Sequence, residues 1–550
     1  MLKLESYKKY LGLLVITIIA AFTRFSYSIP VAFHPDSTKY YVPLQIIYEK
    51  NFSWILDVIN FSLITRIINY FVQSLSNGAT SNIIFYQKIL GTISTILFFF
   101  VAKKISSNKT AVFISTLIFS LNPLMLFFEQ VIMPEALFIC ESCAISLVLL
   151  YFIESPNIKK AILMGILLGL HILTKETGWF FSIAVLSALF ISCLFKDSQN
   201  PLNTGSSDES GFTLLTFTCN KKFVSCLVLV LATGFTLIPW LFYNKNKFNS
   251  FTLDRYKTVC PVIWFLTEEM LTENPSIKHS WITQYILNSY INYKSLYGIP
   301  YYEKNRLAFE SSISNFCVSL RENRFQDLYR NLGINPKESN KIMLEYYLIT
   351  LFNNPRRAYE SFIYNAKILL FNKNFYFSPY RKSQRPGAKY ESIMFTLVPY
   401  STISPVDPLL KNALVVDSSY IDENQVYTDP SHRQVLKGYF PLMVNMDTNR
   451  IILYPEKGFS LWLQKTFVNL PWMRILLPLF LISLILFLIN FKKFFQEKNF
   501  LFYCYLIGSF LLLFGLPVMI HGEARYQLQF THFMIWFILI VLEQGKKSTH

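Results

Sequence analysis

Charged side chains are scarce in this sequence: Asp, Glu, Lys and Arg make up only 15% of its 550 residues, against 52% hydrophobic and 17% aromatic residues. The mean hydropathy is correspondingly positive, at +0.34. A soluble protein of this size needs more polar surface than such a composition supplies. The composition therefore indicates an integral membrane protein.

Several sequence signatures are also missing. The chain has no Walker-type phosphate loop, no Gly-x-Ser-x-Gly, no Rossmann fingerprint and no His/Cys spacing typical of zinc. Its eight cysteines do not form a disulfide framework, because most of them fall in apolar runs. We interpret Cys140-x-x-Cys143 as packing within a helix, and only Cys260 and Cys317 are placed to form a bridge in the segment predicted to lie outside.

Apolar runs long enough to cross a bilayer are numerous. We predict about ten spanning helices, near residues 11–31, 83–101, 111–128, 136–153, 161–174, 178–195, 223–242, 473–491, 499–517 and 527–543. Lys175 and Glu176 interrupt the stretch 161–195, and two spans with a tight outer turn avoid burying this charged pair in lipid. The first run lacks a cleavage site and is predicted to be a retained anchor.

The basic residues orient the spans. The net charge is +17, and with the N-terminus inside, the inner segments carry sixteen lysines whereas the short outer loops carry five basic residues. Lys and Arg favour the cytoplasmic side of membrane proteins. The distribution therefore places both termini inside and explains the basic charge without a nucleic-acid partner.

The segment 243–472 contains no run long enough to span. We predict that it forms one large extracytoplasmic α/β domain between an N-terminal transmembrane module, residues 1–242, and a C-terminal one, residues 473–550. Helical patterns lie near 338–372, including a helix from Pro355 to Phe371 that either packs ordinarily or lies on the membrane, and extended runs lie near 393–399 and 450–454. The predicted fold is thus mostly α, a polytopic membrane helix bundle with a large outer domain.

The charged residues that are candidates for a site all fall on the predicted outer side. They come from four loops: Asp36 after the first span, Glu129 and Glu135 between the third and fourth, Lys175 and Glu176 between the fifth and sixth, and His521, Glu523 and Arg525 between the ninth and tenth. Each alone is typical of an interfacial residue that reaches water. Ionisable groups near lipid are costly unless they are paired or functional, so the set predicts a site at the outer face.

These residue types suit transfer from a lipid phosphate. A carboxylate such as Asp36 can act as general base on an acceptor hydroxyl or can orient an ionised acceptor. Lys175 and Arg525 can hold a phosphate, Arg with a planar two-pronged geometry. A phosphate diester is already a good leaving group, so no general acid is obligatory. Arg24, about two turns below the outer end of the first span, either reaches the phosphate or pairs with Asp36 or another carboxylate.

No cofactor is indicated with certainty. The first outer loop has no Asp-x-Asp, although Asp36 and Glu135 could share a divalent metal ion. We assign no residue as a metal ligand.

Five short motifs follow one another through the predicted membrane modules. They are Asp36-Ser37-Thr38-Lys39-Tyr40, Pro134-Glu135-Ala136-Leu137-Phe138, Leu173-Thr174-Lys175-Glu176, Pro239-Trp240 through Asn244 and Phe248, and Glu523-Ala524-Arg525-Tyr526. In this order, with a large outer segment before the last spans, they resemble the type C (GT-C) glycosyltransferases. The similar group is that of protein O-mannosyltransferases and aminoarabinose transferases. The chain departs from it at Ser37, where the group has Glu, and at Tyr243 and Asn249, where it has Arg and Gly.

The resemblance implies an inverting glycosyltransferase that moves a sugar from a polyprenyl-phosphate donor to a glycan, lipid or protein acceptor. It implies that Asp36 is catalytic and that the donor phosphate is bound by Arg525 and Lys175, with Arg24 nearby. The residues expected to support the site are Tyr40, Glu135, Glu176, His521, Glu523 and Tyr526. The Lys-, Asn-, Ile- and Phe-rich composition favours a bacterial inner membrane with a periplasmic site.

Two other functions remain open. A transporter or flippase for a lipid-linked or polar solute would also span the membrane many times, but transporters tend to place ionisable groups near the midplane rather than at one edge. A non-catalytic assembly subunit is the second alternative, because Ser37 removes an expected carboxylate. The sequence identifies neither the sugar nor the acceptor, and it leaves metal dependence and oligomeric state open.

Overall fold

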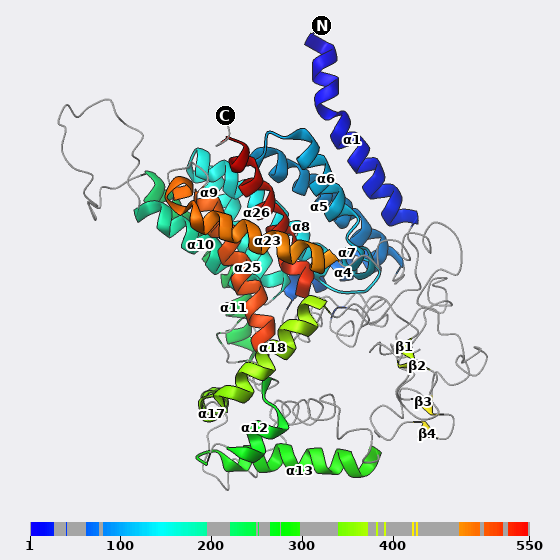
Figure 1. Cartoon of the computed structure of the whole chain (residues 1–550), viewed down its shortest axis with the longest axis vertical. Coiled ribbons are helices and arrows are strands. Elements are labelled where there is room, and N and C mark those ends of the chain that lie inside the picture. Colours follow the sequence, from blue (N-terminus) through cyan, green and yellow to red (C-terminus); the bar gives the residue numbers. More distant parts are fainter. Residues whose placement is uncertain are drawn as a thin grey trace, which may run out of the picture.

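The computed structural model describes residues 2–26, 40, 62–75, 81–175, 177–194, 221–248, 251, 253, 265–274, 277–297, 339–371, 381–382, 390–391, 421–422, 425–426, 472–495, 500–520 and 526–547. This part of the chain is mostly helical (Figure 1). Most of its helices form one bundle, in which the start of α1 and the end of α26 lie toward the same end.

The bundle contains twelve of the described helices, labelled as in Figure 1. They are α1 (Leu2–Ser26), α4 (Leu63–Ser74), α5 (Ser81–Ile105), α6 (Lys109–Ser120), α7 (Pro123–Phe128), α8 (Glu135–Glu154), α9 (Ile158–Thr174), α10 (Gly178–Leu194), α11 (Lys221–Phe248), α23 (Trp472–Ile489), α25 (Phe500–Ile520) and α26 (Gln527–Lys547). A short helix, α24 (Phe491–Phe495), follows α23. Of these, α4 falls in the first predicted outer loop rather than in a predicted span.

Each of the ten predicted spans overlaps helix in the described residues. The stretch 161–195 forms two helices, α9 and α10, as predicted. The stretch 111–128 is broken into α6 and α7, because Asn122 accepts a hydrogen bond from the backbone N–H of Leu124 (3.0 Å) and Pro123 starts the second helix. Within the described residues, five helices are long and apolar enough to cross a membrane: Asn82–Ile105, Glu135–Glu154, Phe223–Lys247, Trp472–Ile489 and Phe500–Met519.

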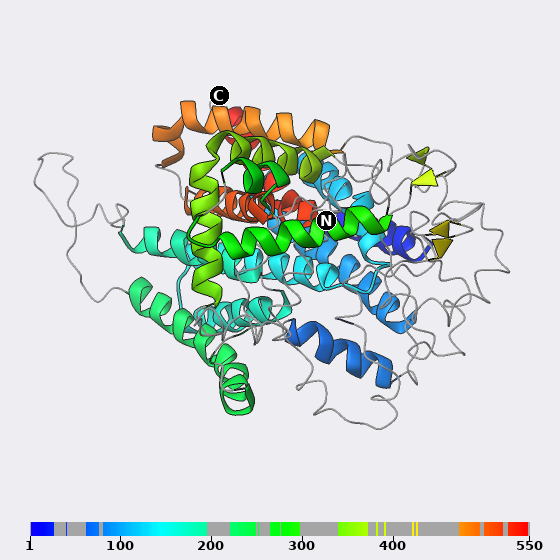
Figure 2. The same ribbon diagram turned by 90° about the horizontal axis from the view of Figure 1, so that it is seen from below.

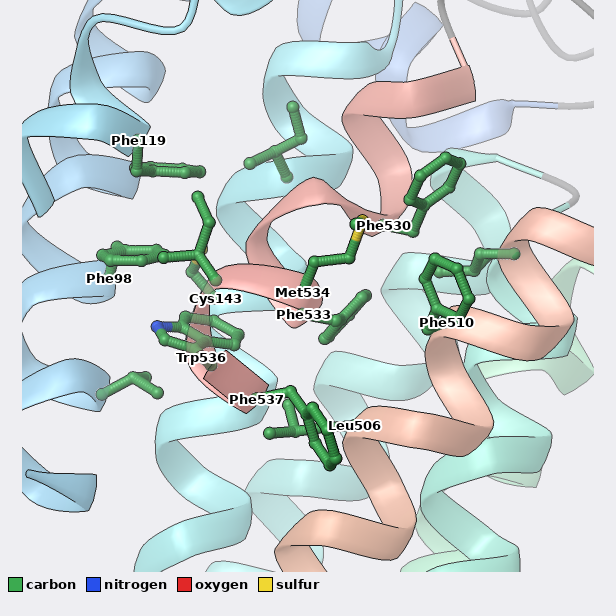
Figure 3. Close-up of a cluster of buried hydrophobic side chains, with 14 of the residues drawn as sticks. Phe98, Phe119, Cys143, Leu506, Phe510, Phe530, Phe533, Met534, Trp536 and Phe537 are labelled. Atoms are coloured by element: carbon green, nitrogen blue, oxygen red, sulfur yellow. The ribbon is translucent and has the colours of Figure 1, made fainter. Parts of the chain in front are cut away.

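The last helix forms the centre of the bundle. Every residue of α26 from Gln527 to Val541 is buried. Its aromatic side chains meet rings of the surrounding helices (Figure 3): Trp536 stacks on Phe98 of α5 with ring centroids 5.0 Å apart, and Phe530 contacts Phe510 of α25 at 5.4 Å. Such pairs add to the free energy of apolar burial. The core is therefore assembled around the C-terminal helix.

The outer faces of the peripheral helices are apolar. Leu11, Leu14, Ile18 and Phe22 of α1 are exposed on one side of that helix. A larger exposed set lies on α23 and consists of Ile475, Leu479, Leu481, Ile482, Ile485, Leu486, Leu488 and Ile489. Large apolar surfaces of this kind suit contact with lipid rather than water.

Within the described residues of the segment 243–472, four further helices lie beyond one end of the bundle (Figures 1 and 2). They are α12 (Glu268–Glu273), α13 (Ser280–Tyr297), α17 (Ser339–Asn353) and α18 (Pro355–Phe371). Two antiparallel pairs of two-residue strands also belong to this segment: β1 (Arg381–Lys382) with β2 (Tyr390–Glu391), and β3 (Ile421–Asp422) with β4 (Gln425–Val426). The extended runs predicted near 393–399 and 450–454 lie outside the described residues, as do Cys260 and Cys317.

The predicted helix from Pro355 to Phe371 is confirmed as α18, and its contacts are those of a packed helix. Asn365 donates from Nδ2 to the Val518 carbonyl of α25 at 2.8 Å, and Gln527 of α26 donates to the Leu369 carbonyl. α18 therefore joins the helices of the segment 243–472 to the last two helices of the bundle.

Candidate functional site

A buried ion pair joins two of the predicted outer loops. Lys175 follows the last residue of α9, and its Nζ donates to Oε1 of Glu135, the first residue of α8, at 2.7 Å. The Glu135 side chain is 1% exposed and that of Lys175 is 11% exposed. α9 ends here because Lys175 has extended backbone angles and its turn closes on Gly178, the first residue of α10. A carboxylate at the first position of a helix also benefits from the helix dipole.

Aromatic side chains surround this pair. The Lys175 ammonium lies 5.3 Å from the ring centroid of Tyr526 and 5.9 Å from that of Phe138. Tyr526 precedes α26, so a third predicted outer loop reaches the same point. The second carboxylate oxygen of Glu135, Oε2, is buried and has no hydrogen-bond partner among the described residues. A buried acceptor of this kind is costly unless something bonds it.

The helix α4 connects Tyr40, in the first predicted outer loop, to the end of α9 beside Lys175. Asn69 donates from Nδ2 to the carbonyl of Tyr40 at 3.0 Å, and the Thr65 hydroxyl donates to the carbonyl of Thr174 at 3.3 Å. Arg66, between Thr65 and Asn69 in the sequence, is also buried. Burial lowers the pKa of its guanidinium to about 10, although charge interaction with the nearby Tyr40 acts in the opposite direction.

α4 is oriented with its polar face inward. Thr65, Arg66, Asn69 and Gln73 are all buried, whereas Phe71 is 54% exposed. A helix surrounded by water would bury the opposite face. The buried polar stripe therefore faces the rest of the protein, where Thr65 and Asn69 contact two of the loops that carry predicted site residues.

The described residues thus bring the four predicted outer loops together, through Tyr40, Glu135, Lys175 and Tyr526, with α4 joining the first loop to the others. The remaining predicted site residues, apart from Arg24, lie outside the described part of the chain: Asp36, Glu176, His521, Glu523 and Arg525. Two of these are sequence neighbours of placed residues, since Glu176 follows Lys175 and Arg525 precedes Tyr526.

The sequence predicts that Arg24 either reaches the donor phosphate or pairs with a carboxylate, and in the structure it pairs with the carboxylate of Glu129. Its Nε donates to Oε1 of Glu129 at 3.0 Å, and the side chain of Arg24 is 0% exposed. Its Nη1 donates to the Ala20 carbonyl and to Ser120 Oγ, both at 3.2 Å. Arg24 therefore ties α1 to the loop between α7 and α8, which leads to Glu135.

Gln87 of α5 holds the same loop from the other side. Its Nε2 donates to the carbonyls of Glu129 (3.1 Å) and Val131 (2.7 Å), and its Oε1 accepts from the backbone N–H of Met133 at 3.4 Å. One side-chain amide thus satisfies three buried backbone groups of an irregular segment. This arrangement fixes the approach to Glu135.

Gly91 leaves the space that the Arg24–Glu129 pair occupies. A Cβ at this position would lie 1.9 Å from Glu129 Oε1 and 2.5 Å from Arg24 Nε. We expect Gly91→Ala to destabilise the protein by about 1–3 kcal/mol, because the buried pair would have to move. Gly234→Ala is the matched control, since nothing lies within 4 Å of a Cβ there. Thermal unfolding of the two purified variants measures the difference, and equal midpoints would contradict this account.

Sequence reasoning missed Arg66, Asn69 and Gln87. For Arg66 and Asn69 the available signal was the repeat of polar residues along α4. Hydropathy alone predicts that such a polar face is exposed to water. Gln87 gave no such signal. A single amide in a long apolar run does not change the prediction of a spanning helix, and it does not indicate which groups the amide bonds.

The structure gives no direct support for a metal centre. Among the described residues, no group of three or more His, Cys, Asp and Glu side chains lies together in a way that could hold a metal ion. From the sequence, Asp36 and Glu135 could share a divalent metal ion, and Asp36 lies outside the described part of the chain.

Comparison with known proteins identifies a related family for part of the chain. Residues 63–200 match the sequence profile of the family described as dolichyl-phosphate-mannose-protein mannosyltransferase. The matched segment contains Glu135 and Lys175 and two of the five motifs, and the match confirms the resemblance to the GT-C glycosyltransferases. No curated protein matches the chain significantly.

Among solved structures, a crystal structure of the oligosaccharyltransferase of Archaeoglobus fulgidus, tethered with an acceptor peptide containing the NVT sequon, aligns with 99% of this chain and 50% of that chain, at 11% identity and a TM-score of 0.39. The chain thus spans about half the length of that protein. A likeness of this size carries no argument about function.

Proposed function

We propose that this protein is an inverting glycosyltransferase that moves a sugar from a polyprenyl-phosphate donor to an acceptor at the outer face of the membrane. The observation that carries the proposal is the buried Lys175–Glu135 pair, which lies inside the matched segment and contacts the loop before α26. A cation held near the end of the bundle by a carboxylate is suited to an anionic ligand that enters from lipid.

The proposed reaction is a single displacement. The Asp36 carboxylate takes the proton of an acceptor hydroxyl as the oxygen attacks the anomeric carbon. The bond from that carbon to the phosphate oxygen breaks on the opposite face, so the configuration inverts and polyprenyl phosphate leaves as a monoester. Lys175 and Arg525 stabilise the charge that develops on the leaving phosphate.

Pairing with Glu135 is compatible with this role of Lys175. The bond from Lys175 Nζ to Glu135 Oε1 holds the ammonium at a fixed position. The positive charge at that position can attract the phosphate of the donor. Arg525 directly precedes Tyr526 in the sequence, and Tyr526 contacts Lys175.

We propose that Asp36 contributes to the same site. It is four residues from Tyr40, so the extended chain between them spans at most about 14 Å. Tyr40 is bonded to Asn69 of α4, and α4 is bonded to Thr174 beside Lys175. Asp36, Glu176, His521, Glu523 and Arg525 thus remain proposed site residues, whereas Arg24 supports the loop that leads to Glu135.

The segment 243–472 is proposed to be an extracytoplasmic domain that selects the acceptor. It gives no specific family motif, and α18 links it to α25 and α26, the helices on either side of the loop that contains Arg525. The proposed location is a bacterial inner membrane with the site on the periplasmic side.

Mass spectrometry of surface glycans and of polyprenyl-phosphate sugars, in cells with and without the gene, tests the function. We expect one glycan or glycolipid to lose a sugar residue while a polyprenyl-phosphate sugar accumulates. The purified protein in lipid nanodiscs should then form the product from that donor and an acceptor extract. A protein that only moves the donor across vesicles and forms no product would instead be a transporter, and unchanged glycans with an unchanged donor pool would contradict the proposal.

The orientation of the chain can be tested separately. Single cysteines introduced near positions 36, 300, 450 and 523, in a background lacking Cys260 and Cys317, should react with an impermeant thiol reagent added outside intact cells. Cysteines near 105, 205 and 495 should react only after permeabilisation, because the positive-inside distribution predicts a cytoplasmic location for these positions. Labelling of position 205 from outside would overturn both the orientation and the proposed site.

A further inference from the structure

A second polar cluster lies further into the bundle than the Lys175–Glu135 pair. It consists of Glu141, six residues after Glu135 on α8, with His171 and Thr174 on α9. None of these three has a role in the reaction described above. Glu141 Oε2 lies 3.1 Å from His171 Nδ1, and Glu141 Oε1 accepts from the Thr174 hydroxyl at 2.9 Å.

This cluster is costly to place inside an apolar bundle. The side chain of His171 is 0% exposed and that of Glu141 is 10% exposed. On its other side the His171 ring reaches Ser142 Oγ at 3.4 Å. Polar and ionisable groups within the membrane are costly unless they are bonded to one another. The side chains satisfy each other across two helices, so the arrangement defines one relative position of α8 and α9.

The cluster lies at the end of α9. Thr174 is the last residue of that helix, and the backbone N–H of Lys175 donates to the His171 carbonyl at 3.2 Å. A Cβ on Gly178 would lie 2.5 Å from that same carbonyl oxygen, so α10 begins in close contact with the His171 backbone. The turn that carries Lys175 is therefore in contact with His171 at both of its ends.

A single aromatic ring connects the cluster to the ion pair. Phe138 of α8 stacks on His171 with centroids 4.0 Å apart and an interplanar angle of 29°, and the Lys175 ammonium lies 5.9 Å from the centre of the same ring. Glu135, Phe138 and Glu141 are spaced three residues apart on α8, which places them on neighbouring positions of adjacent turns. Displacement of His171 would thus move the ring against which Lys175 packs.

We propose that Glu141 and His171 are positioning residues, which set the direction of Lys175 toward the donor phosphate by locking the end of α9 against α8. The identity of the ligand, a lipid-linked phosphate, rests on the proposed function. The positioning of Lys175 rests on the hydrogen bonds of Glu141 and on the contacts of Phe138.

Two variants of Glu141 test the proposal. Glu141→Leu removes both bonds, whereas Glu141→Gln keeps the shape and an oxygen for Thr174. We expect Glu141→Leu to raise the KM for the polyprenyl-phosphate donor by about tenfold or more, with a smaller change in kcat, because misplacement of a positioned group by about 1 Å has effects of at least this order. Glu141→Gln should recover most of the loss. In the background of the double variant Glu135→Gln with Lys175→Met, which removes both charges of the ion pair, Glu141→Leu should have no further effect on the donor KM.

The matched control is Ser146→Ala on the same helix. Ser146 lies five residues after Glu141, a little over one helical turn further from Lys175. Its Oγ forms a buried hydrogen bond of 2.7 Å with the Tyr505 hydroxyl of α25. Ser146→Ala should lower the thermal midpoint, because it removes this partner from a buried hydroxyl, but it should not change the donor KM.

A second readout does not depend on sugar transfer. A cysteine introduced at position 175, together with Glu135→Gln so that no unpaired carboxylate remains buried, should react with an impermeant maleimide at a rate that Glu141→Leu changes several-fold and Ser146→Ala leaves unchanged. If the wild type transfers sugar but neither the donor KM nor this labelling rate responds to Glu141→Leu, the positioning role is overturned. If the labelling rate responds but no polyprenyl-phosphate sugar is a substrate, the positioning of residue 175 stands and the proposed function fails.

Discussion

Replacing Asp36 with Asn is expected to lower the rate of sugar transfer by about 10²–10⁴-fold, the usual cost of losing a general base. The amide keeps the size of the side chain but cannot accept the proton of the acceptor hydroxyl. Ser37 follows Asp36 where the similar glycosyltransferases have Glu, so no adjacent carboxylate can take over the proton. The loss should therefore appear in kcat and persist at saturating donor.

The measurement is transfer from a polyprenyl-phosphate sugar by purified protein in nanodiscs, with expression and the thermal midpoint recorded in parallel. Asp57→Asn is the matched control, because it removes another carboxylate from the same predicted outer segment. Retention of more than about a third of the wild-type turnover by Asp36→Asn would rule out a general-base role.

The helices of the bundle could be predicted from sequence because lipid imposes a simple rule. A spanning segment must satisfy its backbone internally and present apolar side chains outward, so long apolar runs mark helices. The division of 161–195 into α9 and α10 followed from the cost of burying Lys175 and Glu176. The helix from Pro355 to Phe371 could be predicted from its proline start.

The polar contacts inside the bundle could not be predicted in the same way. Hydropathy does not distinguish a side chain that faces lipid from one that faces another helix, and α4 was missed because its polar face is the buried one. The pairing of Arg24 remained open between a phosphate and a carboxylate until the position of Glu129 was known. Likewise, the sequence placed Glu135 and Lys175 on one side of the membrane, but only the packing of α8 against α9 brings their charged atoms within 2.7 Å.

The role of Lys175 can be separated from its contribution to folding, because its partner is known. Lys175→Met alone leaves the Glu135 carboxylate buried without its cation, and breaking a buried pair in this way costs about 3–5 kcal/mol. We expect this single variant to lose both stability and activity. The double variant Glu135→Gln with Lys175→Met removes both charges and should recover most of the thermal stability, since a neutral buried pair carries no unpaired charge.

Transfer by the double variant then decides between two roles. If Lys175 binds the donor phosphate, the stable double variant should still show a donor KM raised by about tenfold or more, because one charge-assisted hydrogen bond to the phosphate is missing. The KM for the acceptor should stay near its wild-type value, because the phosphate belongs to the donor alone. If Lys175 and Glu135 only join α8 to α9, the double variant should transfer sugar normally, and the donor-binding role of Lys175 would be abandoned.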